Sequence, residues 1–420
     1  MIRVRKSIFH NVDWWIVIIY LILVAFGLLS IYAAVYNPEN PSVFDRSQLY
    51  GVQFWWIIIS FLIAIMILMI DMKFFSSFSY LIYGVSMLFL IAVLIFGKEV
   101  SGSKSWIYFG NFSIQPAEFA KFATNLALAR YLSGLNINLK KMNTLLIAVA
   151  FLFLPLGLIL LQNDTGSAIV YLAFVLVLYR EGFSGNFLVL GLVAVVLFVF
   201  TLMAGKFLVL GTITAISIIL FIIIQKVRKN LFALFGLFAL IVAFVFSVDY
   251  AFENVLREHQ KTRIEVLLGK KTDFKGAGYN VNQSLIAIGS GGFSGKGFLQ
   301  GTQTKYKFVP EQSTDFIFCT VGEEWGFIGS TLLIVLFMSL LIRLLFVAER
   351  QRSTFSRIYG YGVASLLFFH FAINIGMTIG LAPVIGIPLP FFSYGGSSLL
   401  AFTILLFIFI KMDSYRLELL

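Results

Sequence analysis

The sequence predicts an all-α fold, a polytopic bundle of about twelve membrane-spanning helices with one long loop outside the membrane. The chain has 420 residues, of which 60% are apolar and only 12% are charged. Apolar runs of about 20 residues recur from one end to the other, and each can cross roughly 30 Å of hydrocarbon as a helix. We therefore expect a single membrane domain over residues 1–420.

The expected spans follow the apolar runs along the chain. The first run is too long for the core of a signal peptide and leads directly into further spans, so we expect it to be retained. The pair between Phe187 and Gln225 carries almost no polar residues except at its ends, so we expect it to face lipid. The twelve spans cover residues 14–35, 52–71, 75–97, 116–133, 143–161, 165–179, 186–204, 207–225, 231–248, 316–347, 358–380 and 391–411.

The distribution of lysine and arginine predicts that both ends of the chain are cytoplasmic. In that orientation the inward-facing loops hold 17 of these bases and the short outward-facing loops hold four. Such an excess is typical of short cytoplasmic loops. Nine expected spans precede Asp315, so this acid and the long loop 249–315 face the outside. The net charge of +11 is spread over short loops instead of a patch, so we predict no nucleic-acid partner.

Cysteine and histidine are too sparse for redox or metal chemistry. Cys319 is the single cysteine, so no disulfide can form within the chain. The three histidines, His10, His259 and His370, show no metal-ligand spacing. We predict no metal site built from these side chains and no cofactor that the sequence requires.

A polar stripe interrupts the fourth span, QPAEFAKFATNLALARYLSG (115–134). Glu118, Lys121 and Asn125 share one helical face, because they lie at offsets of three and seven residues. A charge at the bilayer centre costs about 2.5–3.5 kcal/mol, so an ionisable residue there is a candidate for function. Two interpretations stay open: a buried pair that neutralises itself, or a stripe that lines a wet cavity and also receives an anionic ligand.

A second irregular stretch, GLAPVIGIPLPFFSYGGSS (380–398), accompanies the last span. Its three prolines exclude a continuous helix, and Gly395 and Gly396 permit a tight turn. Such backbone at membrane depth survives only where it lines a cavity or is buried in protein. We expect a loop that dips between the helices, and an ordinary external turn is the alternative.

The long loop 249–315 is polar, basic and rich in glycine, with nine Lys or Arg beside seven acids. Such a surface next to a membrane cavity suits a phosphate or sugar ligand. The run GSGGFSGKG (289–297) looks like a nucleotide-binding P-loop, but Ser290 and Gly297 stand where that pattern requires a glycine and a Ser or Thr. We therefore do not expect nucleotide binding there.

Asp315 stands where this loop ends and the next span begins, in FVPEQSTDFIFCTVGEEWGFIG (308–329). An acid at a helix start also suits capping and the helix dipole, which are worth about 0.3–2 kcal/mol. Thr314 could fill that role alone. The residues by themselves leave both alternatives open, chemistry at Asp315 or a structural cap.

Four stretches together resemble one protein family. They are SGSKSWIYFGNFSIQPAEFAKFA (101–123), GAGYNVNQSLIAIGSGGFSGKGFLQGTQ (276–303), residues 308–329 quoted above, and GIPLPFFSYGGSS (386–398). They are similar to the SEDS family, named for shape, elongation, division and sporulation, and to its rod-shape branch more than to its division branch. The resemblance covers nearly the whole chain.

The resemblance implies a peptidoglycan glycosyltransferase of the bacterial inner membrane. Such an enzyme polymerises lipid II, an undecaprenyl-diphosphate-linked disaccharide pentapeptide, on the periplasmic face during cell elongation. The family's essential aspartate, in its TDF motif, corresponds to Asp315. The implied partners are lipid II, the lipid-linked glycan strand, and a class B penicillin-binding protein that acts as the cross-linking transpeptidase.

The chain also departs from the family pattern. Members usually have ten spans, so the pair near 187–225 is an even insertion that preserves sidedness. The family's QPDLGT appears as QNDTGS (162–167), and Phe274 replaces the proline of DPxGAGY. Lys307 stands where several relatives carry glutamate.

With the resemblance, we expect Asp315 to act as general base on the 4-hydroxyl of an incoming sugar, a contribution of roughly 10²–10⁴ in rate. Cations would neutralise the diphosphates, and a divalent ion, Mg²⁺ or Mn²⁺, could assist them. A two-carboxylate mechanism with Glu311 or Glu323 ranks lower, because a diphosphate leaving group needs no protonation. The residues expected to bind substrate are Glu118, Lys121, Arg263, Gln283, Lys296, Glu311 and Ser393.

Two other functions would use the same features. A flippase of lipid-linked cell-wall precursor would use the same cavity and cations, and would move lipid II without lengthening it. A non-catalytic scaffold that only positions a transpeptidase would need no acid at the cavity rim.

Overall fold

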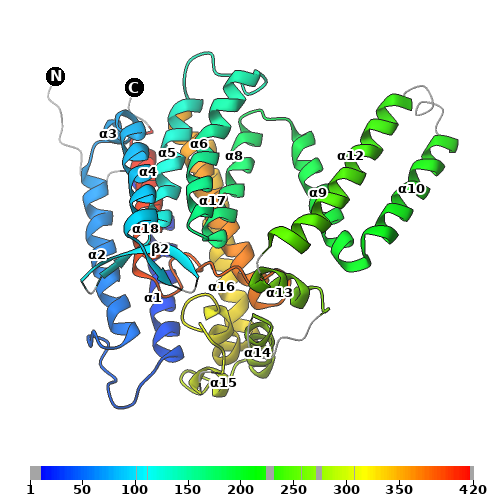
Figure 1. Ribbon diagram of the computed structural model, residues 1–420. Helices are drawn as coiled ribbons and strands as arrows, with labels where there is room; N and C mark the ends of the chain where they lie inside the picture. The colour runs from blue at the N-terminus through cyan, green and yellow to red at the C-terminus, as the bar shows by residue number, and fades with distance from the viewer. Residues whose placement is uncertain are drawn as a thin grey trace, which may run out of the picture. The chain divides into compact units, whose positions relative to one another are not determined.

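The computed structural model (Figure 1) describes residues 11–100, 102–110, 112–223, 231–256, 258–270, 277–306 and 308–416. It is mostly helical, so the predicted all-α fold is confirmed. The chain forms two compact units. One joins Met1–Phe183 to Asn280–Leu420, and the other is Ser184–Tyr279. The departures noted at Phe274 and Lys307 lie outside the described residues.

The first unit is a bundle of apolar helices with α17 and α18 at its centre (Figure 1). In the membrane windows of these two helices, 72% and 83% of the residues are buried, against 28% in α2. α2 packs on α18, α4 on α5, and α16 on both α1 and α17. The helical elements are α1 (Trp14–Ala34), α2 (Leu49–Met69), α3 (Met72–Ser77), α4 (Ser79–Phe96), α5 (Pro116–Leu132), α6 (Met142–Leu161), α7 (Thr165–Ile169), the 3₁₀ turn η1 (Val170–Ala173), α8 (Phe174–Arg180), most of α14 (Ala277–Ser290), α15 (Thr302–Lys305), α16 (Ile317–Glu349), α17 (Thr354–Thr378) and α18 (Gly396–Ser414).

The second unit contains the predicted lipid-facing pair. Only 6% of the membrane window is buried in α9 and in α10, as expected for helices that face lipid. Gly205, at φ 83°, makes the tight turn between them. Lys206 pairs with Asp249 at the end of α12 (2.7 Å). The elements are α9 (Gly185–Ala204), α10 (Lys206–Ile223), α12 (Leu231–Tyr250), the π turn η2 (Ala251–Val255) and α13 (Glu258–Leu267).

Ten of the described helices are long and apolar enough to cross a membrane. The two remaining expected spans correspond to α5, which carries the polar stripe, and to Thr165–Arg180, where η1 separates α7 from α8. The count of twelve spans stays a prediction. The expected loop 249–315 is partly helical, since it contains α13, α14 and α15.

A small antiparallel sheet between α4 and α5 was not predicted. It leads into α5, whose start is fixed by α18: Ser397 Oγ donates to Ser113 O (3.0 Å) and accepts from Gln115 N (3.3 Å). Pro116 then occupies the first helical turn, where its missing N–H costs nothing. The strands are β1 (Lys98–Val100), β2 (Ser103–Phe109) and β3 (Phe112–Ile114), with β2 in the middle.

A charged cluster joins the start of α1 to the ends of α16 and α18. Asp13 accepts from Ile16 N at the α1 N-terminus and pairs with Arg343 (2.7 Å) and Arg350 (2.8 Å). Arg350 also pairs with Asp413 (2.5 Å). Burial raises the pKa of the Asp13 carboxyl, but the two guanidiniums lower that pKa by more, so it lies below its usual value.

Candidate active site

Asp315 lies in a tight turn that leads into α16. Glu311, at φ 55°, closes the turn: its carbonyl oxygen accepts from Thr314 N (3.2 Å) and Phe316 N (3.1 Å). Thr314 Oγ1 donates to Glu311 Oε2 (2.9 Å). The N-cap position of α16 belongs to Phe316, so neither Asp315 nor Thr314 is the cap that the sequence left as an alternative. The Asp315 side chain is half-buried.

The proline-rich stretch runs between α17 and α18 as a non-helical segment, residues 379–395, which we call the re-entrant segment and which is mostly buried from Ile387 onward. Ile387, Leu389 and Phe392 are at most 2% exposed, which supports the loop that dips between helices over an external turn. The segment contacts the Asp315 turn, because Tyr394 N donates to Ser313 O (2.9 Å).

Gly386 brings the re-entrant segment directly against the candidate base. A Cβ built on Gly386 would lie 3.2 Å from Asp315 Oδ2, and the glycine has φ 80°. Ser393, expected to contact substrate, is buried, and its Oγ accepts from Leu389 N (2.9 Å) within the segment. In this structure Ser393 therefore shapes the segment that carries Gly386.

Two polar side chains of α17 hold the same segment. Asn374 Nδ2 donates to both Asp315 O (2.9 Å) and Ile387 O (2.8 Å). His370 Nδ1 lies 3.2 Å from Pro388 O, and its Nε2 lies 3.0 Å from Lys121 Nζ. Lysine has no acceptor, so Nε2 accepts from Lys121 and Nδ1 donates to Pro388. The candidate base is thus connected to α17 and, through the re-entrant segment, to α5.

The polar stripe of α5 is buried as an ion pair. Lys121 Nζ lies 2.8 Å from Glu118 Oε1 and 4.9 Å from the centre of the Phe402 ring. Both charged side chains are at most 4% exposed. The self-neutralising pair is therefore present, while the second oxygen of Glu118 is buried without a hydrogen-bond partner among the described residues. Asn125 donates to Tyr359 O (2.9 Å), which ties the same face to α17.

The QNDTGS motif also reaches this region. Asp164 caps α7 by accepting from Ser167 N (3.0 Å), and it accepts from Gln115 Nε2 at the start of α5 (2.7 Å). A Cβ on Gly166 would lie 2.9 Å from Ile385 O, so α7 packs closely on the re-entrant segment. The starts of α5 and α7 and the re-entrant segment therefore converge.

The glycine-rich run 289–297 supplies hydrogen-bond partners at a break in α16. Gly326, at φ 61°, interrupts this helix. The run supplies the missing acceptors, because Phe327 N donates to Gly292 O (3.0 Å) and Ile328 N to Phe293 O (3.2 Å). Irregular backbone within a membrane helix needs such replacement partners.

Lys296 of this run is already paired. Its Nζ lies 2.7 Å from Glu323 Oε1 and 2.8 Å from Thr302 Oγ1. Glu323 is fully buried and also accepts from Gln303 N and Thr304 N. This enclosure gives Glu323 a structural role, which argues against it as the second acid of a two-carboxylate mechanism.

The other predicted substrate contacts are Gln283, Arg263 and Glu311. Gln283 is half-buried on α14, and Arg263 belongs to α13 of the second unit. Glu311 is exposed on the Asp315 turn. Sequence reasoning missed Asn374 and used His370 only for metal spacing. Both are polar residues inside a predicted span, the same signal that singled out Glu118 and Lys121.

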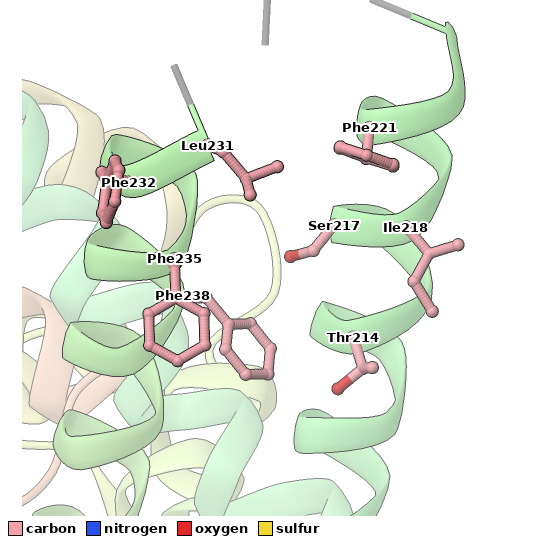
Figure 2. Close-up of a pocket in the computed structure, with 8 residues that line it drawn as sticks. All are labelled: Thr214, Ser217, Ile218, Phe221, Leu231, Phe232, Phe235 and Phe238. Carbon is pink, nitrogen blue, oxygen red and sulfur yellow. The ribbon is translucent and has the colours of Figure 1, made fainter. Parts of the chain in front are cut away.

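Each of the two units contains an apolar cavity. One of about 400 Å³ lies between α4, α5 and the sheet. The other, of about 440 Å³, lies between α10 and α12 within the second unit, and Figure 2 shows the rings of Phe235 and Phe238 turned toward the helix that carries Ser217 and Thr214. Neither is lined by a predicted site residue. Among the residues that the structure describes, no group of three His, Cys, Asp or Glu side chains could hold a metal ion.

Comparison with known proteins places the chain among relatives of matching length. A model of a cell cycle protein family named for FtsW, RodA and SpoVE matches residues 13–209 and 188–418. The peptidoglycan glycosyltransferase RodA of Treponema pallidum is 35% identical, over 92% of this chain and 94% of its own. The peptidoglycan glycosyltransferase MrdB of Escherichia coli is 30% identical, over 93% and 90%.

Solved structures agree with this. A chain from a peptidoglycan synthase complex, studied for the coordination of polymerization and crosslinking, superposes with a TM-score of 0.70 at 28% identity, covering 97% of this chain and 99% of that one. A variant of the rod shape determining protein RodA from Thermus thermophilus superposes with a TM-score of 0.63 at 25% identity, covering 97% and 99%. The chain is therefore a polytopic membrane protein that belongs to the SEDS family, the family of FtsW, RodA and SpoVE.

Proposed function

We propose that this chain, a peptidoglycan glycosyltransferase of the SEDS family, polymerises lipid II into glycan strands on the periplasmic face, with Asp315 as general base. The observation that carries the proposal is the placement of Asp315. Its half-buried carboxyl stands at the end of a tight turn, its main chain is bound by α17, and a glycine of the re-entrant segment leaves room beside Oδ2.

The proposed reaction is a displacement at the anomeric carbon of the growing strand. The 4-hydroxyl oxygen of incoming lipid II forms a bond to that carbon, and the bond from the carbon to the diphosphate oxygen breaks. The lipid diphosphate leaves with the bonding electron pair, and the hydroxyl proton passes to the Asp315 carboxylate. A positioned base contributes about 10²–10⁴ in rate to such a step.

The substrate diphosphates need cations, and two of the cations predicted for this role are engaged with acids. Lys121 pairs with Glu118 and Lys296 with Glu323. A substrate phosphate would therefore share each lysine with its carboxylate, because displacing the carboxylate would leave a buried charge unpaired. Arg263 stays a phosphate contact predicted from the sequence alone, and a divalent ion could share the role of these cations.

The apolar cavity beside α5 suits the polyprenyl chain of the substrate. Pro116 and Phe119 line this cavity from the same helix that carries Glu118 and Lys121. A lipid tail in the cavity would place its diphosphate near the polar start of α5. Apolar cavities with polar groups at one end are the usual form of such sites.

The proposed setting is the bacterial inner membrane, with both chain ends in the cytoplasm. The excess of lysine and arginine in the inward-facing loops supports this orientation. Polymerised strands still need cross-linking, so we propose a class B penicillin-binding protein as partner. A solved relative from a synthase complex that joins polymerization to crosslinking supports that pairing.

The test is polymerisation of purified lipid II by Asp315→Asn with the transpeptidase partner present. We expect kcat to fall by about 10²–10⁴, because the amide cannot accept the proton. Asp45→Asn is the matched control: it removes a half-buried carboxylate between α1 and α2 and should leave kcat unchanged. If Asp315→Asn makes polymer at the wild-type rate, Asp315 is not the general base.

The same material tests the flippase alternative, which the buried Glu118–Lys121 pair keeps open. Liposomes holding fluorescent lipid II in one leaflet report its transfer to the other. Transfer without lengthening of the glycan would favour the flippase, whereas glycan polymer without transfer supports the polymerase.

A further inference from the structure

We propose that Asn374 is a positioning residue for this reaction: its side-chain amide holds the backbone of Asp315 against residues 386–388, so that the carboxylate is fixed relative to the bound sugar. The inference rests on the proposed role of Asp315. Asn374 lies on α17 and is completely buried.

Both hydrogens of the Asn374 amide form hydrogen bonds where the Asp315 turn meets the re-entrant segment, a contact that we call the junction. Nδ2 donates to Asp315 O (2.9 Å) and to Ile387 O (2.8 Å), which belong to segments about 70 residues apart in the chain. Two carbonyl oxygens repel each other at short range, and a shared donor between them turns this repulsion into attraction. Asn374 therefore sets the spacing between the turn before α16 and the re-entrant segment.

The junction controls the side chain of Asp315 as well as its main chain. Gly386 immediately precedes Ile387, and its Cβ position lies 3.2 Å from Asp315 Oδ2. Moving Ile387 away from Asn374 would therefore move the wall beside the carboxylate. The neighbouring carbonyl of Pro388 is held by His370 from the same helix, four residues earlier than Asn374.

The hydrogen-bond donors of Asn374, and not its packing, explain why an amide side chain occupies this position. Asn374 Oδ1 is buried without a hydrogen-bond partner among the described residues, which destabilises the folded state. Leucine has a similar size and would avoid that cost. Only the two hydrogen bonds of Nδ2 compensate for it.

The test is a graded pair of substitutions assayed with lipid II and the transpeptidase partner. Asn374→Leu removes both donors at similar size. Asn374→Asp keeps the shape, and a carboxyl buried between two carbonyl oxygens stays protonated and donates once. We expect kcat to fall about 10²-fold for leucine and about 10-fold for aspartate, with KM changed less than about threefold, because a small displacement of a reacting group costs that much.

Gln351, before the start of α17, supplies the matched control. It is a buried amide whose Nε2 also donates twice, to Val347 O (2.9 Å) and Asp413 Oδ1 (2.7 Å), far from Asp315 in the chain. Gln351→Leu and Gln351→Glu should lower Tm at least as much as the Asn374 changes and leave kcat within about threefold, since no reacting group moves.

Three outcomes would overturn the proposal. The first is a folded Asn374→Leu protein with the wild-type kcat. The second is a loss of kcat that follows the loss of Tm to the same extent in the Gln351 and Asn374 variants. The third is that Asn374→Leu loses no more kcat than Asn374→Asp. If Asn374→Leu does not fold, Asn374→Asp decides alone. The failures are distinguishable: an inactive Asp315→Asn with normal Asn374 variants refutes only the positioning role, whereas an active Asp315→Asn refutes the base itself.

Discussion

At the scale of single residues, the site depends on a few positions where only one side chain type fits. Gly386 is such a position, because it combines φ 80° with a Cβ position 3.2 Å from Asp315 Oδ2. Asn374 is another, since its two donors bind carbonyls of two segments. The chemistry proposed for Asp315 therefore depends on two uncharged neighbours, Gly386 and Asn374.

Gly386→Ala should reduce polymerisation more than its effect on stability explains. We expect kcat to fall about 10-fold or more, because the methyl group crowds the carboxylate, together with about 1–2 kcal/mol of backbone strain from the positive φ. The measurement is the rate of lipid II polymerisation beside thermal unfolding in detergent.

Gly380→Ala is the control for that prediction. Gly380 has φ 74° in the same segment, but its Cβ position meets only side-chain carbons of Val281 and Leu285 at 3.5 Å and 3.8 Å. It should lose similar stability and keep most of its rate. Equal rates in the two variants would show that the space beside Asp315 is not needed.

At the scale of elements, the apolar pattern predicted helices well and their interruptions poorly. The span expected over 316–347 is α16, Ile317–Glu349, and the face shared by Glu118 and Lys121 is present as an ion pair. The break at Gly326 was not predictable from hydropathy, because its hydrogen bonds are completed by Gly292 and Phe293, more than thirty residues earlier. The small sheet was missed because its strands are short and lie between two long helices.

Acidification should weaken the charged cluster that joins α1, α16 and α18. Because the pKa of Asp13 lies below its usual value in the folded protein, its stabilising effect is full above the unfolded pKa of about 3.9 and is lost as pH falls through the folded pKa. We expect a level Tm from pH 7 to about 5 and a decline below about 4.

Asp13→Asn should remove part of that acid-dependent decline. At pH 7 it should lower the free energy of unfolding by about 1–2 kcal/mol, a value reduced because the guanidiniums of Arg343 and Arg350 are one-third exposed. The comparison is of Tm against pH for both proteins. If the Tm curves of the wild type and Asp13→Asn stay parallel down to pH 3, Asp13 is not a source of the loss of stability in acid.

At the scale of the whole molecule, the sequence predicted the class of protein and the family correctly, and the role of Asp315 as base stays a prediction. The predicted substrate contacts Glu118, Lys121, Lys296 and Ser393 are engaged within the protein, so their roles stay predictions. Sequence spacing could not show this, because each partner comes from a distant segment or depends on a folded turn. The orientation in the membrane likewise rests on charge alone and needs its own experiment.

The orientation can be measured with introduced cysteines. Cys319 is completely buried, so a membrane-impermeant thiol reagent should not label the unmodified protein. Ser42→Cys, exposed between α1 and α2, should react in intact spheroplasts. Leu135→Cys, exposed between α5 and α6, should react only after permeabilisation. The reverse pattern would invert the proposed topology.

The interruption at Gly326 has a mechanical consequence. An unbroken helix transmits a tilt along its whole length, but here the stretch from Ile317 to Trp325 is hydrogen-bonded at its far end to the glycine-rich run instead of to the rest of α16. The portion beyond Gly326 is anchored separately through Arg343. The short stretch next to Asp315 therefore takes its position from the glycine-rich run, which also holds Phe327 and Ile328 beyond the break.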